Sequence, residues 1–196
     1  MRLFFAIDLP EGLTQPFAAL QDDLCGADGL RFTDPTQAHL TMKFLGDVPE
    51  EEAGNGERGD GGPTVADAKA AGAAAVDAAD LPPFEVEVGG LGAFPSEEYI
   101  SVVWAGVRDG AADLEALAAT LETEATDRGF DAAEKEFTPH VTLARMDDAR
   151  GKDLVQDYLR NTDPTVGRFR VDELRLERSV LTDEGADYRT VARFPL

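Results

Sequence analysis

The chain of 196 residues has only 1 cysteine, and it lacks the long apolar runs of membrane-spanning proteins. Because Cys25 is alone, an internal disulfide is excluded, and a reducing cytoplasm is the expected location. No apolar run approaches the roughly 20 residues that cross a bilayer, so no membrane partner is expected. Residues 1–10 carry a single basic side chain, which favours a strand over a signal peptide.

Positive charge is also scarce, because 18 lysines and arginines stand against 39 acidic residues and give a net charge of −21. A disordered acidic tail, an acidic partner surface and adaptation to strong salt would each explain this charge. The acidic residues are spread along the whole chain, which argues against the tail. In molar salt the Debye length is only about 3 Å, so self-repulsion is screened. We therefore predict a halophilic protein, without an extended nucleic-acid-binding face.

Apolar residues make up 43% of the chain and include 11 phenylalanines, enough for one sizeable core and a single domain over residues 1–196. Alternating apolar residues predict strands and helical spacing predicts helices, in an order typical of an α+β fold. The predicted strands are 3–7, 39–46, 84–88, 99–107, 140–145, 169–176 and 188–196, and the predicted helices are 13–24, 64–79, 114–125 and 154–159.

Three segments depart from the regular spacing of the predicted strands and helices. Residues 50–63 are acidic and glycine-rich, which predicts a flexible loop. The segment Gly89 to Pro95 predicts a turn-rich connection. The apolar alternation changes phase between Val171 and Leu174, and a bulge at 172–173 would explain the change.

Both histidines stand in one pattern, since His39 is followed two residues later by Thr41 and His140 by Thr142. The two motifs lie about half the chain apart, as an internal duplication would place them. Each opens a predicted strand, where side chains alternate between faces. Each motif therefore presents an imidazole and a hydroxyl side by side on one surface.

Two such pairs suit acid–base displacement at phosphorus. Imidazole has an unperturbed pKa of about 6.5, so one ring can be neutral while the other is protonated. One ring then takes a proton from the attacking oxygen and the other gives one to the leaving oxygen. Each hydroxyl can donate to a non-bridging oxygen. The residues alone do not say which histidine is the acid.

Two other readings of the motifs stay open at this point. Each histidine could be structural, bonded to a neighbour, although the repetition of the motif argues for function. A metal site is the second alternative, but the pattern lacks the second ligand that a His-x-His or His-Glu-x-x-His motif supplies. We therefore predict no metal and no cofactor.

The sequence resembles the RNA 2',3'-cyclic phosphodiesterases, also called 2'-5' RNA ligases, within the two-histidine phosphoesterase superfamily. The resemblance covers nearly the whole chain. It is carried by the opening MRLFFAIDLP, the motif segments HLTMKFLGDV and FTPHVTLAR, the middle segments GLGAFP and VVWAGV, and the closing YRTVARFPL. Residues 54–62 depart from it as an acidic, glycine-rich insertion.

The resemblance implies two pseudo-symmetric lobes, each an antiparallel sheet with helices packed outside, and a central cleft lined by both motifs. It implies hydrolysis of a 2',3'-cyclic phosphate, on an RNA end or a small nucleotide, to a 2'-phosphomonoester. It also implies that His39 is the proton donor and His140 the acceptor, with Thr41 and Thr142 holding the phosphoryl oxygens. We expect a monomer.

Four further side chains are candidates for contacts with the substrate. By period two, Lys43 shares the face of His39 and Thr41, so it could meet phosphate. In the family pattern Arg145 follows the second motif and is implied to bind substrate, although strict alternation puts it on the face opposite the histidine. Trp104 and Tyr99 could stack on bases, but their apolar strand favours core packing.

Two alternative functions use the same residues. A non-catalytic module could bind RNA ends or nucleotides in a retained cleft. Ligation of RNA halves by the reverse reaction would need the same two motifs. Turnover of a cyclic nucleotide separates an enzyme from a binding module.

Overall fold

The computed structural model describes residues 1–49, 62–182 and 185–196. Most of the loop predicted at 50–63, including nearly all of the insertion at 54–62, lies outside the described residues. The described strands are β1 (Arg2–Asp8), β2 (Leu30–Phe32), β3 (His39–Asp47), β4 (Phe84–Pro95), β5 (Ile100–Val107), β6 (His140–Met146), β7 (Thr165–Val171), β8 (Glu173–Thr182) and β9 (Gly185–Pro195). The helices are α1 (Thr14–Asp23), α2 (Val65–Ala79), α3 (Ala111–Thr126) and α4 (Lys152–Asn161), with short 3-10 turns η1 (Glu11–Leu13) and η2 (Pro35–Gln37).

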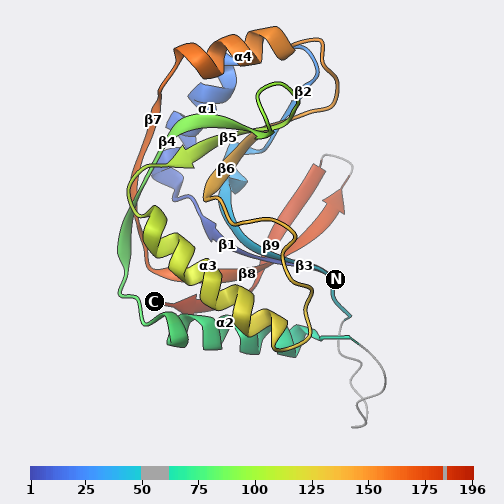
Figure 1. The fold of residues 1–196 in the computed structure, drawn as a ribbon, viewed down its shortest axis with the longest axis vertical. Helices are drawn as coiled ribbons and strands as arrows, with labels where there is room; N and C mark the ends of the chain where they lie inside the picture. Colours follow the sequence, from blue (N-terminus) through green and yellow to red (C-terminus); the bar gives the residue numbers. More distant parts are fainter. Residues whose placement is uncertain (50–61, 183–184) are drawn as a thin grey trace.

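The strands form one antiparallel sheet in the order β7-β4-β5-β6-β3-β1-β8-β9, with β2 paired to β6. Helices α1 and α4 lie at one end of the molecule, and α2 and α3 lie at the other (Figure 1). Each half of the sheet therefore has its own pair of helices, and β3 and β6 meet in the middle. No described helix is long and apolar enough to span a membrane.

The core follows the predicted alternation. Leu3, Phe5 and Ile7 of β1 are buried in the apolar cluster beneath the helices. Thr64 caps α2. Its hydroxyl accepts from the Asp67 backbone N–H at 3.3 Å, and the Asp67 carboxylate accepts from the Thr64 backbone N–H at 2.9 Å. This reciprocal bonding is the usual helix-start signature.

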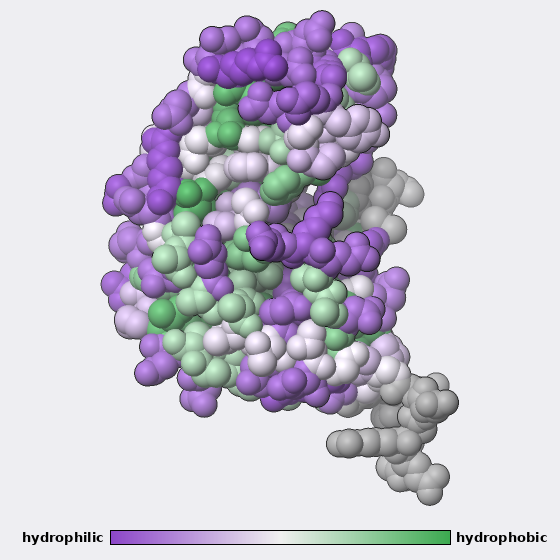
Figure 2. Space-filling view, in the orientation of Figure 1, coloured by the Kyte–Doolittle hydropathy of each residue, from purple (hydrophilic) through white to green (hydrophobic). Residues whose placement is uncertain are grey.

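Helix α2 lies close to the sheet at Gly72. A Cβ atom at Gly72 would stand 2.5 Å from the Phe194 ring and 2.7 Å from the Phe5 ring, so only glycine fits there. The face in Figure 2 is hydrophilic over much of its area, most densely at the end formed by α4. That surface suits a chain with a net charge of −21.

Two predictions about the elements were wrong, and one strand was missed. The segment from Gly89 to Pro95 is not a connection but the second half of β4. The short strand β2 was not predicted, because its 3 residues are too few to show a period. The phase change after Val171 is not a bulge: β7 pairs with β4 and β8 pairs with β1, so the chain crosses at Asp172 from one half of the sheet to the other.

Candidate active site

The two motifs meet where the halves of the sheet join. Leu40 of β3 pairs with Val141 of β6, and both side chains are fully buried on the helix side. One step along this antiparallel pair, His39 comes opposite Thr142 and His140 opposite Thr41. Because neighbouring side chains alternate, all four project to the other face of the sheet. The structure brings the predicted residues together.

Each imidazole is held by the carbonyl two residues before it. Nδ1 of His39 lies 2.9 Å from the Gln37 carbonyl oxygen, and Nδ1 of His140 lies 2.7 Å from the Thr138 carbonyl oxygen. A carbonyl only accepts, so in both rings Nδ1 carries the hydrogen. Nε2 is then the nitrogen that can give or take a proton. The two motifs thus orient their rings alike.

Aromatic rings surround both histidines. The His39 ring packs between Phe4 and Tyr188, with centroids 5.1 and 5.0 Å away. The His140 ring packs against Phe94 and Trp104, with centroids 4.9 and 5.9 Å away. These contacts leave each imidazole partly buried and restrict its rotation.

Burial lowers the pKa of both rings from the ordinary value of 6.5, because it disfavours the charged form. For His39, the negative charge of Asp8 and the backbone contact oppose this shift. For His140, the backbone contact opposes it, but the positive charges of His39 and Arg145 lower the pKa further. His39 therefore has a negatively charged neighbour, whereas His140 has positively charged neighbours.

A bulge displaces Lys43 from the predicted face. The register between β1 and β3 slips between Phe5 and Ala6, which makes Met42 an extra residue of β3. Both Met42 and Lys43 are then buried on the helix side. The prediction that Lys43 shares a face with His39 is wrong, because strict alternation does not survive a bulge.

On the helix side Lys43 has partners of its own. Its Nζ donates to Glu122 Oε2 at 2.7 Å and to the Asp131 carbonyl oxygen at 3.0 Å. The Glu122 pKa is lowered, because the contacts with Lys43 and with the Ala133 N–H outweigh the opposing burial, which is the largest single influence. The ammonium ties β3 to α3 and lies apart from the candidate site.

The equivalent bulge in β6 has the opposite effect on Arg145. The register between β5 and β6 slips between Val103 and Trp104, which makes Leu143 an extra residue of β6. Leu143 and its successor are both buried, so the alternation restarts and exposed Arg145 returns to the face of His140.

Buried polar groups stabilise this second bulge. The Gln21 side chain of α1 donates to the Leu143 carbonyl at 3.0 Å and to the Thr33 carbonyl at 2.8 Å. The Thr33 hydroxyl donates to the Thr142 carbonyl at 2.8 Å. The bulge thus has its free backbone groups satisfied from outside the sheet, as buried carbonyls require.

The two aromatic side chains predicted to pack in the core do not lie there. Tyr99 is 71% exposed. Trp104 pairs with Thr142 across β5 and β6 and lies against His140, over Gly92 and Gly106. Its indole nitrogen is buried without a hydrogen-bond partner among the described residues. The sequence showed an apolar strand but not which of its faces is covered by helices.

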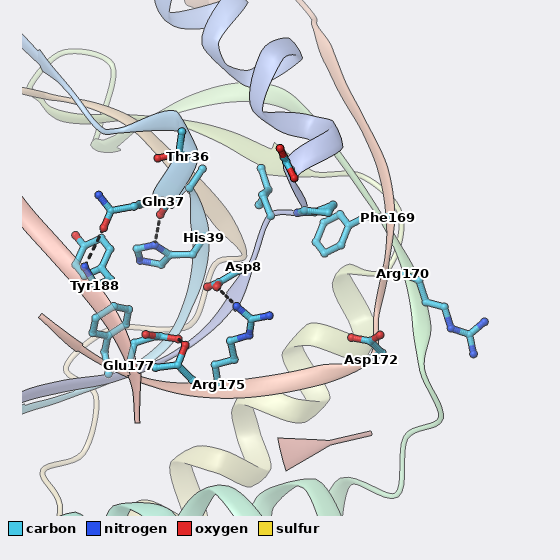
Figure 3. Close-up of a pocket in the computed structure, with 16 residues that line it drawn as sticks. Asp8, Thr36, Gln37, His39, Phe169, Arg170, Asp172, Arg175, Glu177 and Tyr188 are labelled. Atoms are coloured by element: carbon cyan, nitrogen blue, oxygen red, sulfur yellow. Dashed lines mark hydrogen bonds and ion pairs between the residues drawn. The ribbon is translucent and has the colours of Figure 1, made fainter. Parts of the chain in front are cut away.

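A pocket of about 530 Å³ opens beside His39, between β1, β7, β8 and β9 (Figure 3). Asp8 points toward His39 and toward Arg175, with which it forms an ion pair. Glu177 is 4% exposed and accepts from the Thr190 hydroxyl at 2.7 Å. Burial raises the pKa of Glu177.

The sequence did not single out these pocket residues. Alternation along β1 does place Asp8 on one face with Phe4, but which strand lies beside β1 depends on pairings between distant segments. Among the residues that the structure describes, no three histidine, cysteine or acidic side chains are grouped as metal ligands would be.

The fold and the paired motifs define a class. This α+β fold has one antiparallel sheet with helices packed outside it, and each of the two central strands carries a His-x-Thr motif. It is the two-histidine phosphoesterase fold. The chain belongs to the 2'-5' RNA ligase superfamily, whose family model matches residues 9–182.

Two archaeal relatives carry the name RNA 2',3'-cyclic phosphodiesterase. The protein of Methanothermobacter thermautotrophicus is 34% identical over 200 residues, which cover 100% of this chain and 99% of the relative. The protein of Aeropyrum pernix is 36% identical over 155 residues, or 78% of each chain.

Solved structures share the fold over the whole chain. LigT of E. coli complexed with 3'-AMP superposes with a TM-score of 0.74 at 26% identity, covering 100% of this chain and 97% of LigT. A Thermus thermophilus protein superposes with a TM-score of 0.73 at 30% identity, covering 100% of this chain and 98% of its own.

Proposed function

We propose that this protein hydrolyses the 2',3'-cyclic phosphate of RNA ends or small nucleotides and leaves a 2'-phosphomonoester. The observation that carries the proposal is the meeting of two His-x-Thr motifs on one face of the sheet, at the Leu40–Val141 pair. Relatives along the full chain are named for this activity. The pair of oriented imidazoles is the acid–base equipment that such a displacement needs.

In the proposed reaction His140 takes a proton from water through Nε2. The water oxygen forms a bond to phosphorus while the bond from phosphorus to the ribose 3'-oxygen breaks. His39 gives its Nε2 proton to that leaving oxygen. The product carries a 2'-phosphate and a free 3'-hydroxyl, and exchange with solvent restores the starting charges of both rings.

The threonines stabilise the charge that develops on phosphorus. Thr41 and Thr142 stand on the same face as the rings, so each hydroxyl can donate to a non-bridging oxygen. Arg145, brought to this face by the β6 bulge, binds the same anion through its guanidinium. We thus assign the contacts with the phosphate to the seam between the two halves of the sheet.

We assign the nucleoside to the pocket beside His39. Its volume of about 530 Å³ falls within the range of small-ligand sites. The leaving 3'-oxygen belongs to the ribose, so the nucleoside must lie on the side of the acid. A chain with a net charge of −21 can hold one cyclic phosphate locally without a basic face.

We further propose that residues 1–196 act as one domain of two pseudo-symmetric lobes, as a monomer. The protein works in the cytoplasm. No metal ion or cofactor takes part, because protonated and neutral imidazole supply both proton transfers.

The test is to incubate RNA ending in a 2',3'-cyclic phosphate with the protein and EDTA in molar KCl, and to identify the product. A 2'-phosphomonoester is expected. An intact cyclic phosphate on RNA that nevertheless binds would indicate a binding module. Loss of activity with EDTA that Zn²⁺ or Mn²⁺ restores would overturn the metal-free mechanism. Adding RNA with a 5'-hydroxyl end shows whether the reverse ligation also occurs.

A further inference from the structure

The near-symmetry of the two motif strands is broken at one neighbouring position. On the outer side of β3, the residue paired with His39 is Asp8 of β1. On the outer side of β6, the residue paired with His140 is Gly106 of β5. The same step of the same kind of strand pair therefore holds a carboxylate beside one histidine and no side chain beside the other.

Gly106 has little room for a side chain. A Cβ atom there would stand 3.2 Å from the Gly89 carbonyl oxygen and 3.2 Å from the Trp104 ring. The indole occupies the space that a carboxylate would need. The His140 side of the site is thus closed to the arrangement seen at His39.

Asp8 is fixed in place by one cation of β8. Its carboxylate is ion-paired with Arg175, whose guanidinium also donates to Glu173 at 2.5 Å. Figure 3 shows the Asp8 carboxylate between His39 and Arg175. This contact holds Asp8 at the pocket wall next to the imidazole.

Several other charged or titratable groups line the pocket beside His39 or face this histidine across the seam. In the pocket they are Glu11 of η1, Arg170 of β7, Asp172 between β7 and β8, Arg175 and Glu177 of β8, and Tyr188 of β9. Across the seam, the group is His140 of β6. Asp8 is the carboxylate whose charge raises the His39 pKa, whereas His140 is affected by two positive charges that lower its own. The paired position therefore matches the direction of the electrostatic difference.

We propose that Asp8 is a positioning residue that retains the proton on His39 and so makes His39, rather than His140, the acid of the pair. The assignment of catalytic roles rests on the proposed function. The electrostatic interaction between Asp8 and His39 is independent of the proposed function and can be measured without turnover. Arg175 weakens this interaction, because its positive charge partly cancels the negative charge of Asp8.

The first test uses the fact that the chain has 2 histidines, which give two imidazole resonances in proton–carbon NMR spectra. Titrations are run on the full chain, at the lowest KCl concentration that keeps it folded. Asp8→Asn is expected to lower the proton affinity of His39 about threefold or more, as Coulomb's law gives for charges on paired strands. The His140 midpoint should move much less.

Arg175→Met separates this effect from structural damage. Both variants break the same ion pair, so a structural role for Asp8 would change the His39 midpoint in one direction in both. The proposal requires opposite directions, because Arg175→Met leaves the carboxylate unopposed and raises the affinity. Asp47→Asn, at the exposed far end of β3, removes one negative charge and should leave the midpoint in place.

The second test is the pH profile of kcat/KM for a 2',3'-cyclic nucleotide. Asp8→Asn should move the alkaline limb to lower pH and leave the acid limb unchanged, since the alkaline limb reports loss of the acid's proton. An unchanged His39 midpoint, or shifts in the same direction in Asp8→Asn and Arg175→Met, would overturn the inference. Movement of the acid limb instead would reverse the roles. A wild type without turnover would overturn only the proposed function.

Discussion

Phe44 and Arg145 occupy the same position in two equivalent strands, five residues after His39 and His140. In both strands an extra residue after the threonine resets the alternation. Phe44 is then 62% exposed and packs against Phe4, whereas Arg145 presents a cation near the second histidine. The duplication thus extends to the bulges, while the side chains that they present differ.

The bulge in β6 places Arg145 on the face of His140, where we propose that it binds the substrate phosphate. Arg145→Gln removes the charge, so we expect KM to rise about 10- to 100-fold, as the loss of a charge-assisted hydrogen bond implies. The melting temperature should hardly change, because the side chain is exposed. Steady-state kinetics and thermal melts measure both. An unchanged KM would remove Arg145 from the site.

Lys43 should show the opposite behaviour. Lys43→Gln leaves Glu122 without its ion pair, and we expect unfolding in urea to become easier by about 1–3 kcal/mol. KM of the folded variant should stay close to that of the wild type. Lys135→Gln, at an exposed lysine, is the matched control and should change neither quantity. A raised KM at unchanged stability would show that Lys43 contacts the substrate and does not serve to stabilise the fold.

Glu177 makes stability depend on pH. Its pKa is raised above 4.5 in the folded chain, so its favourable contribution is complete below 4.5 and is lost as pH rises through the folded value. Glu177→Gln keeps an acceptor for Thr190 and cannot ionise. The variant should melt a few degrees above the wild type at neutral pH, and the gap should close toward pH 4.5. A gap that does not vary with pH, or one shared by exposed Glu115→Gln, would contradict this account.

The net charge of −21 predicts that the fold weakens as ionic strength falls. The melting temperature, followed by circular dichroism, should be clearly higher in molar KCl than at about 50 mM, where the Debye length exceeds 10 Å. A melting temperature that does not respond to salt would remove the halophilic explanation and favour an acidic partner surface.

The motifs could be predicted from the sequence because they are local. The spacing of His39 and Thr41, and of His140 and Thr142, fixes which side chains share a face within a strand. The bulges could not be predicted, because they depend on register with neighbouring strands and on groups such as Gln21 from a distant helix. The wrong prediction for the Lys43 side chain follows from the bulge in β3, which the sequence did not reveal.

The pocket also depends on long-range pairing. Asp8 is brought beside His39 by pairing between β1 and β3, and Arg175 is brought to Asp8 by pairing between β1 and β8. The crossing at Asp172, which carries the chain between the halves of the sheet, appeared in the sequence only as a change of phase. Alternation reports which residues share a face but not which strands are neighbours.

The threonines test how the transition state is stabilised. Thr41→Val and Thr142→Val keep the side-chain shape and delete one donor each, so kcat should fall about 10- to 1,000-fold with little change in KM. Melting temperatures should stay near the wild-type value, because no hydrogen bond of either hydroxyl holds the described fold together. Variants that unfold while the remaining folded fraction turns over normally would make the threonines structural.

The most direct test of the account is a double-mutant cycle on His39 and His140, with kcat measured on a 2',3'-cyclic nucleotide. Each single change to alanine removes one proton transfer and should lower kcat about 100- to 10,000-fold. Because both rings act in one displacement, the double variant should lose far less than the product of the single losses. Single variants that turn over normally, or losses that multiply fully, would contradict the claim that the two histidines act together on one phosphate.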